Sequence, residues 1–286
     1  MLACSLTATL AAQSIYVAND DSGTIGEYGP DGSTINASLI SGLSNPNGIT
    51  ISGDDLFVAT QNPGTIGEYT TSGVIVNASL ISGLNIPGGV AISGNNLFVV
   101  DYGNGTVGKY TTSGVTVNAS LVSGLSGPHG IAFSGNNLFV VNYDRGTVGE
   151  YTTSGAAVNT SLISGLNSPT SIAVSGNDLF VASFSSQEHA YTIGEYTTSG
   201  STVNASLITG FDSPQGIAIS GNDLFVSNTG DGTIGEYTIS GATVDVDLIS
   251  GLSDPYGIAI SPVPEPSTIA LAALGVATLC LRRWRI

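Results

Sequence analysis

An internal repeat of about 41 residues runs through this sequence and restricts the folds that the chain can adopt. A Gly-Glu-Tyr or Gly-Lys-Tyr string occurs six times, and its tyrosines are separated by 41, 41, 41, 45 and 41 residues. A second string, Pro-x-Gly-Ile in most copies, recurs at the same intervals from Pro46 to Pro255. Self-similarity at a fixed period is the mark of a repeat architecture. We therefore expect one structural unit to be built six times, with a four-residue insertion near Ser183–Tyr191 in one copy.

Each period contains four short strand-like runs separated by turn signals such as Gly-Asn-Asn. In the third copy the runs are Gly89–Ser93, Leu97–Asp101, Thr106–Thr111 and Val115–Val122. No segment before residue 262 shows a sustained apolar pattern with a helical period. Four strands in a period of about 40 residues are typical of a propeller blade. The sequence therefore predicts an all-β fold, a six-bladed β-propeller.

The repeat array, residues 14–261, begins and ends in the middle of a repeat. It opens on a second run, Ser14–Ala18, and finishes on a first run, Gly257–Ser261. These two strands are expected to complete one blade together. Such pairing closes the ring and removes the exposed edges of an open sheet.

The Leu-Phe-Val run of each copy predicts the packing between blades. An inner strand that is covered on both faces reads as continuously apolar rather than alternating. One aromatic position recurs in every copy and is expected to fill the core: Tyr16, Phe57, Phe98, Phe139, Phe180 and Phe225.

One rim of the predicted ring varies between copies, whereas the turns of the opposite rim are nearly uniform. The six residues that follow the repeated prolines are Asn47, Gly88, His129, Thr170, Gln215 and Tyr256. A quasi-symmetric ring can select a ligand only where its copies differ, so we expect this rim to bind one. The alternative is sequence drift in loops under weak constraint. The predicted ligand-binding residues are Asn47, His129, Thr170, Gln215, Tyr256, Tyr102, Tyr143, Arg145 and Phe184.

Charge excludes one class of partner. The net charge is −16, and residues 1–261 contain 20 acidic side chains against two basic ones, Lys109 and Arg145. Proteins that bind nucleic acid or anionic lipid carry a basic patch. The acidic body of this chain therefore excludes nucleic acid as a partner.

Few residues could support catalysis. The chain has two histidines, His129 and His189, both on the variable rim, and Glu188 or Asp144 could complete an acid–base pair with His129. The strings Pro-x-Gly-Ile-Ala, Leu-Phe-Val and Gly-Thr-Ile-Gly-Glu-Tyr resemble those of the NHL and streptogramin-lyase propellers. These families include lyases that use His and Glu on a propeller face, but their motif does not align here residue by residue. A secreted lyase or hydrolase is therefore an alternative to a binding protein.

Three oxygen-rich loop segments would suit Ca²⁺. They are Asp20-Asp21, Asp101-x-x-Asn104 and Asn228-x-x-Asp231. None has the spacing of an EF-hand, and acidic loops are commonly just solvated. We expect no cofactor, with structural calcium as the alternative.

The C-terminal segment, residues 262–286, breaks the repeat. Pro264-Glu265-Pro266 precedes an apolar run of 13 residues, Ile269–Leu281, which would be about 20 Å long as a helix. This is short for a membrane span. The arginines Arg282, Arg283 and Arg285 would face the cytoplasm and leave the propeller outside.

These three parts, in this order, resemble the PEP-CTERM sorting signal of exported bacterial proteins. The resemblance implies recognition by an exosortase and cleavage near Pro264–Pro266. It also implies anchoring in the membrane before processing, followed by release to the cell surface or extracellular matrix.

The N-terminal residues 1–13 look like the apolar core and small-residue cleavage site of a signal peptide. They lack a basic segment, so we expect the true initiator upstream of Met1. The two cysteines, Cys4 and Cys280, lie in the two terminal segments, which leaves the propeller without a disulfide.

Together these features predict an exported, exosortase-processed binding module that does not catalyse a reaction. Its expected partner is an extracellular polysaccharide or protein. A purely structural matrix protein is the third alternative.

Overall fold

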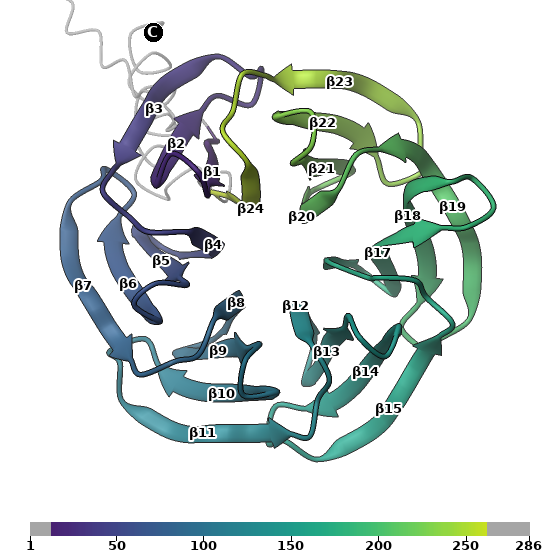
Figure 1. Cartoon of the computed structure of the whole chain (residues 1–286), viewed down its shortest axis with the longest axis horizontal. Helices are drawn as coiled ribbons and strands as arrows, with labels where there is room; N and C mark the ends of the chain where they lie inside the picture. Colours follow the sequence, from purple (N-terminus) through teal and green to yellow (C-terminus); the bar gives the residue numbers. More distant parts are fainter. Residues whose placement is uncertain (1–12, 262–286) are drawn as a thin grey trace, which may run out of the picture.

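The computed structural model describes residues 13–261, which form a ring of six antiparallel sheets (Figure 1). A central channel runs between the innermost strands of the ring. Each sheet has four strands and is one blade of a propeller. The predicted six-bladed β-propeller is therefore confirmed. Residues 1–12 of the predicted signal segment (residues 1–13) and the whole sorting segment with its apolar helix (residues 262–286) lie outside the described residues.

The blades follow one another around the ring in sequence order. Blade 1 contains β24 (Pro255–Ile260), β1 (Ile15–Asn19), β2 (Thr24–Tyr28) and β3 (Thr34–Ile40). Blade 2 contains β4 (Pro46–Ser52), β5 (Asp55–Thr60), β6 (Thr65–Thr70) and β7 (Ile75–Ser82). Blade 3 contains β8 (Pro87–Ser93), β9 (Asn96–Asp101), β10 (Thr106–Thr111) and β11 (Thr116–Ser123).

The second half of the ring has the same plan. Blade 4 contains β12 (Pro128–Ser134), β13 (Asn137–Asn142), β14 (Thr147–Thr152) and β15 (Ala157–Ser164). Blade 5 contains β16 (Ile172–Ser175), β17 (Asp178–Ser185), β18 (Ala190–Thr197) and β19 (Thr202–Phe211). Blade 6 contains β20 (Pro214–Ser220), β21 (Asp223–Asn228), β22 (Thr233–Thr238) and β23 (Thr243–Ile249).

Blade 1 closes the ring by joining the two ends of the array. Strand β24 pairs with β1, with Ile15 opposite Ile260. The backbone N–H of Ser261 also donates to the carbonyl oxygen of Ser14 at 2.9 Å. The pairing predicted from the two orphan strands is thus present, and blade 1 has the same four strands as the other blades.

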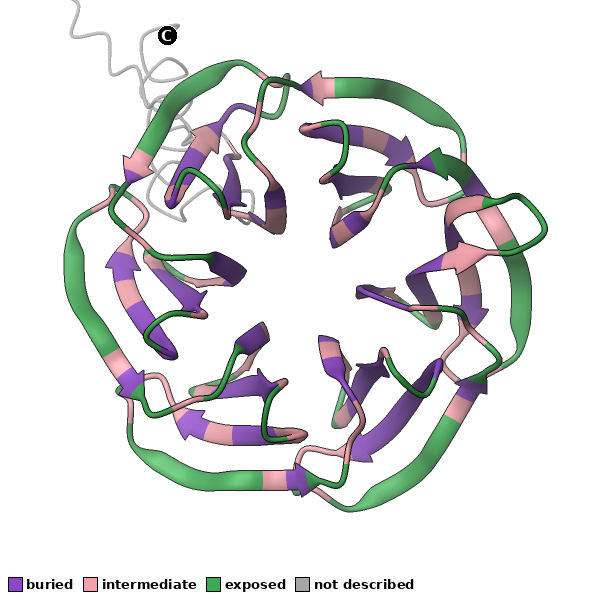
Figure 2. Ribbon diagram, in the orientation of Figure 1, coloured by how far each residue is buried: buried purple, intermediate pink, exposed green. Residues whose placement is uncertain are grey.

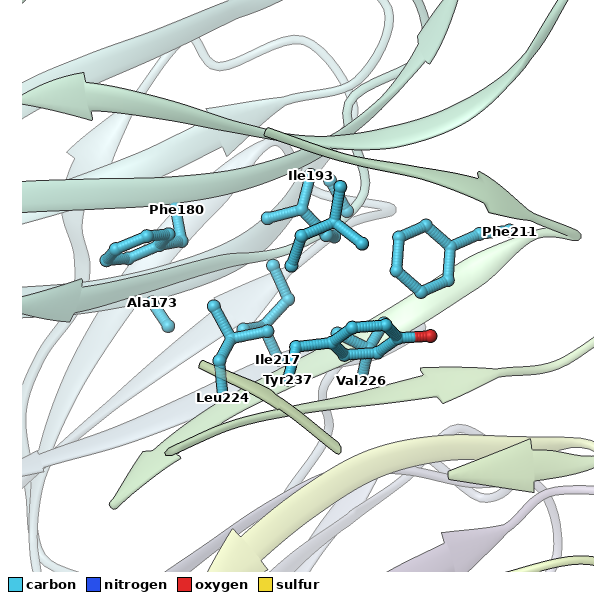
Figure 3. Close-up of a cluster of buried hydrophobic side chains, with 10 residues drawn as sticks. Ala173, Phe180, Ile193, Phe211, Ile217, Leu224, Val226 and Tyr237 are labelled. Atoms are coloured by element: carbon cyan, nitrogen blue, oxygen red, sulfur yellow. The ribbon is translucent and has the colours of Figure 1, made fainter. Parts of the chain in front are cut away.

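The core lies between neighbouring blades, and the outermost strands are largely exposed (Figure 2). The phenylalanines Phe57, Phe98, Phe139 and Phe180 are each 1% exposed, as expected for strands covered on both faces. Figure 3 shows one such interface, where Phe180 and Ile193 of blade 5 meet Leu224 and Val226 of blade 6. Packing of one sheet face on the next holds the ring together.

The glycine of the Pro-x-Gly-Ile string lets the innermost strands approach each other closely. A Cβ atom on Gly48 would collide with the carbonyl oxygen of Gly88, and one on Gly216 would collide with that of Tyr256. Blade 5 has Ser171 at this position, and there β16 is ordered as a strand only from Ile172 onward. Glycine therefore recurs at this position because the neighbouring innermost strands lie too close together to leave room for a side chain.

The four-residue insertion lengthens the hairpin of β17 and β18, which protrudes from the ring (Figure 1). Across residues 13–261 the structure has no helix long and apolar enough to cross a membrane.

Candidate ligand-binding site

A pocket of about 300 Å³ lies at one end of the central channel, on the rim that varies between copies. We call it the mouth pocket. All six residues that follow the repeated prolines line it, one from each blade. Its lining residues are Asn47, Gln61, Ile86, Gly88, Tyr102, His129, Tyr143, Thr170, Gln215 and Tyr256.

The turn into each innermost strand brings these residues to the channel. The residue before each repeated proline has a positive φ, which for non-glycine residues is uncommon. These residues are Asn45, Ile86, Gly127, Ser168, Ser213 and Asp254, with φ between 47° and 59°. Ile86 is the least suited, because a β-branched side chain is strained in this conformation. Its side chain is 43% exposed and lines the mouth pocket.

His129 is half-buried in the pocket wall and has a defined tautomer. Its Nδ1 lies 2.8 Å from the carbonyl oxygen of Thr170 in the next blade. A carbonyl oxygen only accepts, so Nδ1 donates, and Nε2 of the neutral ring keeps its lone pair. Burial lowers the pKa of His129, and this hydrogen bond opposes the shift. The ring of Tyr143 lies beside it, with 6.5 Å between the ring centroids.

Hydrogen bonds between blades fix much of the pocket wall. Thr170 Oγ1 donates to the carbonyl oxygen of Pro214 at 2.7 Å, which links blades 5 and 6. Ser227 Oγ donates to the carbonyl oxygen of Tyr256 at 2.6 Å, which links blades 6 and 1. This side of the pocket is therefore organised before any ligand arrives.

Gln215 carries an unused acceptor. Its Oε1 is buried and has no hydrogen-bond partner, while its Nε2 donates to Ser213 Oγ at 3.4 Å. Most buried polar atoms are paired, so an unpaired acceptor in a pocket wall favours a ligand or water that donates to it.

Beneath the mouth pocket the channel narrows to a throat of about 90 Å³, whose wall includes the repeated glycines and Ser171. Beyond the throat lies a wider cavity of about 500 Å³ at the opposite end, which we call the far cavity. Six apolar side chains, one from each blade, are among its lining residues: Ile51, Ile92, Phe133, Val174, Ile219 and Ile260.

The structure brings together some of the predicted site residues but not all of them. Arg145 and Asp144 are exposed on the loop after β13 and do not line the pocket. Phe184 packs against Tyr191 next to the turn of the β17–β18 hairpin, with ring centroids 5.4 Å apart. Glu188 and His189 are exposed near the tip of this hairpin, outside the pocket lining.

Three lining residues are not among the predicted ligand-binding residues: Gly88, Gln61 and Ile86. Gly88 is one of the six residues that follow the repeated prolines. Gln61 lies in the loop between β5 and β6, which belongs to the variable rim. Ile86 immediately precedes a repeated proline. Attention to the residue before each proline, as well as the one after it, would have found Ile86.

An acidic cluster lies on the same rim in blade 1. One carboxylate oxygen from each of Asp20, Asp21 and Asp254 lies within 4.8 Å of the others. Burial and the neighbouring carboxylates raise the pKa of Asp254, and burial raises that of Asp20. The pKa of Tyr256 is raised by burial and by the three carboxylates.

The other two oxygen-rich loops use their oxygens internally. Asp101 accepts from the backbone N–H groups of Asn85 and Asn104, both at 3.1 Å. Asn228 Oδ1 accepts from the backbone N–H of Asp212 at 2.7 Å. Their side chains cap the loops, and structural calcium on this rim stays the alternative to the expectation of no cofactor.

Comparison with known proteins identifies the C-terminal segment. Residues 262–285 match the PEP-CTERM protein-sorting motif, as predicted. This motif implies recognition by an exosortase and export with a membrane-anchoring sorting step at the C-terminus. Among curated proteins, none matches the chain.

Two solved structures share the propeller fold at low sequence identity. A chain in the nidogen/laminin complex is 15% identical, with a TM-score of 0.76 over 89% of this chain and 100% of that chain. A catalytically inactive virginiamycin B lyase from Staphylococcus aureus, with quinupristin, is 20% identical, with a TM-score of 0.64 over 87% of this chain and 89% of that chain. At these identities the similarity establishes the fold alone.

Proposed function

We propose that this chain is an exported, exosortase-processed binding module that acts at the cell surface or in the extracellular matrix, with its ligand in the mouth pocket. One observation carries the proposal. Six structurally equivalent positions, one per blade, hold six different residues, and all of them converge on one pocket. Preformed pockets with a few convergent polar groups are the usual form of a ligand site.

The direction of β24 supports an orientation of the anchored propeller in which the mouth pocket faces away from the membrane. This strand runs from Pro255 at the mouth to Ile260 in the wall of the far cavity. The sorting motif begins immediately afterwards, at residue 262. Seven residues separate Ser261 from the apolar run at Ile269, so the two residues lie at most about 29 Å apart. While the chain is anchored, the far cavity therefore faces the membrane and the mouth pocket stays accessible from outside.

The composition of the pocket favours binding over catalysis. None of its lining residues is a carboxylate, lysine or arginine. His129 donates to a backbone carbonyl rather than to an acid, so no acid–base pair with Glu188 or Asp144 is assembled there. A catalytic His generally needs a partner that tunes its pKa and orients it.

The test is capture of the producing bacterium's extracellular polymer and secreted proteins by the purified full chain. A double variant, Tyr143→Ala with Gln215→Ala, removes one ring and one amide from the pocket. We expect it to lower the affinity about tenfold or more, or about 1.4 kcal/mol. The matched control is Asn95→Ala with Asn136→Ala, which changes two exposed turn residues on the opposite rim and should retain full binding.

Two results would overturn the proposal. Capture that is equal for both double variants would show that the mouth pocket is not the site. Breakdown of the captured material that His129→Ala abolishes, with binding intact, would establish the lyase or hydrolase alternative instead.

A further inference from the structure

We infer that the mouth pocket binds an uncharged saccharide, taken as one or two sugar rings at the end of a glycan. The inference rests on the proposed function, because it names the ligand class of the same pocket.

The polar groups of the pocket suit hydroxyl groups. Asn47, Gln61 and Gln215 each place an amide in the pocket wall, although one N–H of Gln215 already donates to Ser213. An amide can both donate and accept, and so can a sugar hydroxyl. The buried Oε1 of Gln215 needs a donor, which a hydroxyl supplies. Nε2 of the neutral His129 is a second acceptor, because Nδ1 already donates to Thr170.

The apolar groups suit the C–H faces of a sugar ring. Tyr102, Tyr143 and Tyr256 are half-buried and line the pocket together with Ile86. A tyrosine offers a broad apolar ring for packing and a hydroxyl for a hydrogen bond, so it contacts the two kinds of sugar surface at once. Three tyrosines beside three amides match an amphipathic ring better than a purely apolar ligand.

Charge restricts the class to neutral sugars. The lining contains no cationic side chain that could pair with a uronate or sulfate. The carboxylates of Asp20, Asp21 and Asp254 lie close enough to Tyr256 to raise its pKa, so these charges repel an anion at this side of the pocket. A cationic ligand would need a carboxylate in the pocket itself, and none lines it.

Size restricts the ligand to a chain end. The mouth pocket has a volume of about 300 Å³, which is at the small end of the range for small-molecule sites. The throat below it, about 90 Å³, is closed in by backbone at the repeated glycines. A sugar end can enter this pocket, but a polymer cannot thread through the channel.

The experiment uses the full chain and the extracellular polymer that it captures. Acid hydrolysis of this polymer gives mono- and disaccharides, which ion exchange separates into neutral, anionic and cationic fractions. We expect the neutral fraction to compete with capture and the anionic fraction to be at least about tenfold weaker. We also expect Gln215→Met, which keeps the length of the side chain and removes the unused acceptor, to weaken the neutral competitor about tenfold, whereas Asn95→Ala leaves it unchanged.

The outcomes separate this inference from the proposed function. If capture depends on Tyr143 and Gln215 but only a charged fraction competes, or none does, the saccharide inference is overturned and the binding site stands. If capture does not depend on these two residues, both the saccharide inference and the proposed function are overturned.

Discussion

The two ends of the central channel are built by the same six innermost strands, yet they differ in kind. At the far cavity the strands contribute large apolar side chains in every blade, five aliphatic ones and Phe133. At the mouth pocket the same strands contribute an amide, a glycine, an imidazole, a hydroxyl, a second amide and a phenol. At the far cavity all six blades contribute the same kind of packing. At the mouth pocket the blades contribute different groups, which can distinguish one ligand from another. We therefore expect changes at the far cavity to alter stability and changes at the mouth to alter binding.

The largest effect should come from Phe133→Ala in the far cavity. Phe133 packs edge-on against Phe98, with ring centroids 4.8 Å apart. Because Phe133 is only half-buried, we expect a loss of about 2–3 kcal/mol in the free energy of unfolding, below the usual range for a fully buried phenylalanine. Thermal unfolding should show Tm lowered by about 4–10 °C, with ligand capture unchanged.

Tyr143→Ala is the matched change at the mouth. It should shift the free energy of unfolding by less than about 1 kcal/mol while weakening capture. A loss of stability as large as that of Phe133→Ala would contradict the division between the two ends.

A smaller effect, of opposite sign, is expected from Ile86→Asn. Asparagine tolerates the left-handed conformation and occupies the equivalent position in blade 2, as Asn45 with φ 55°. Relief of the strain should raise the free energy of unfolding by about 1 kcal/mol, measured by urea denaturation with an unchanged m-value. The same variant removes an apolar contact from the mouth pocket, so capture should weaken. A variant that is both less stable and fully active would show that Ile86 is neither strained nor part of the site.

The smallest effect is expected from Asp254→Asn in the acidic cluster. The pKa of Asp254 is raised from its ordinary value of 3.8, so the folded state favours the protonated carboxyl. This contribution to stability is present at low pH and is lost as the pH rises through the folded-state pKa. The variant should therefore have a Tm about 1–3 °C above that of the wild type at pH 7, and a smaller advantage at pH 4.

Asp144→Asn, an exposed change on the same rim, is the control for the acidic cluster and should leave Tm unchanged. A lower Tm for Asp254→Asn at pH 7, reproduced in the wild type by a chelator, would contradict the prediction and support bound calcium.

Most of the fold could be predicted, because its signals are local. The runs predicted in the third copy agree with β8–β11 to within two residues at each end. The site could be predicted only in part. The repeat places Asn47 and Gln215 at the mouth, but it does not say in which direction a loop side chain points. Arg145 and Phe184 were expected in the site for this reason, and Ile86 was overlooked because a left-handed turn aims its side chain into the channel.

The amino-acid pattern determined the number of blades, the position of each strand and the pairing of the first strand with the last. These features follow from a fixed period and from apolar runs, which act over a few residues at a time. Only the tertiary structure decided which side chains share the mouth pocket, which nitrogen of His129 stays free, and that Asp254 joins Asp20 and Asp21. Each of these depends on contacts between different strands or blades, some more than 200 residues apart in the chain, and such contacts are fixed only once the ring has closed.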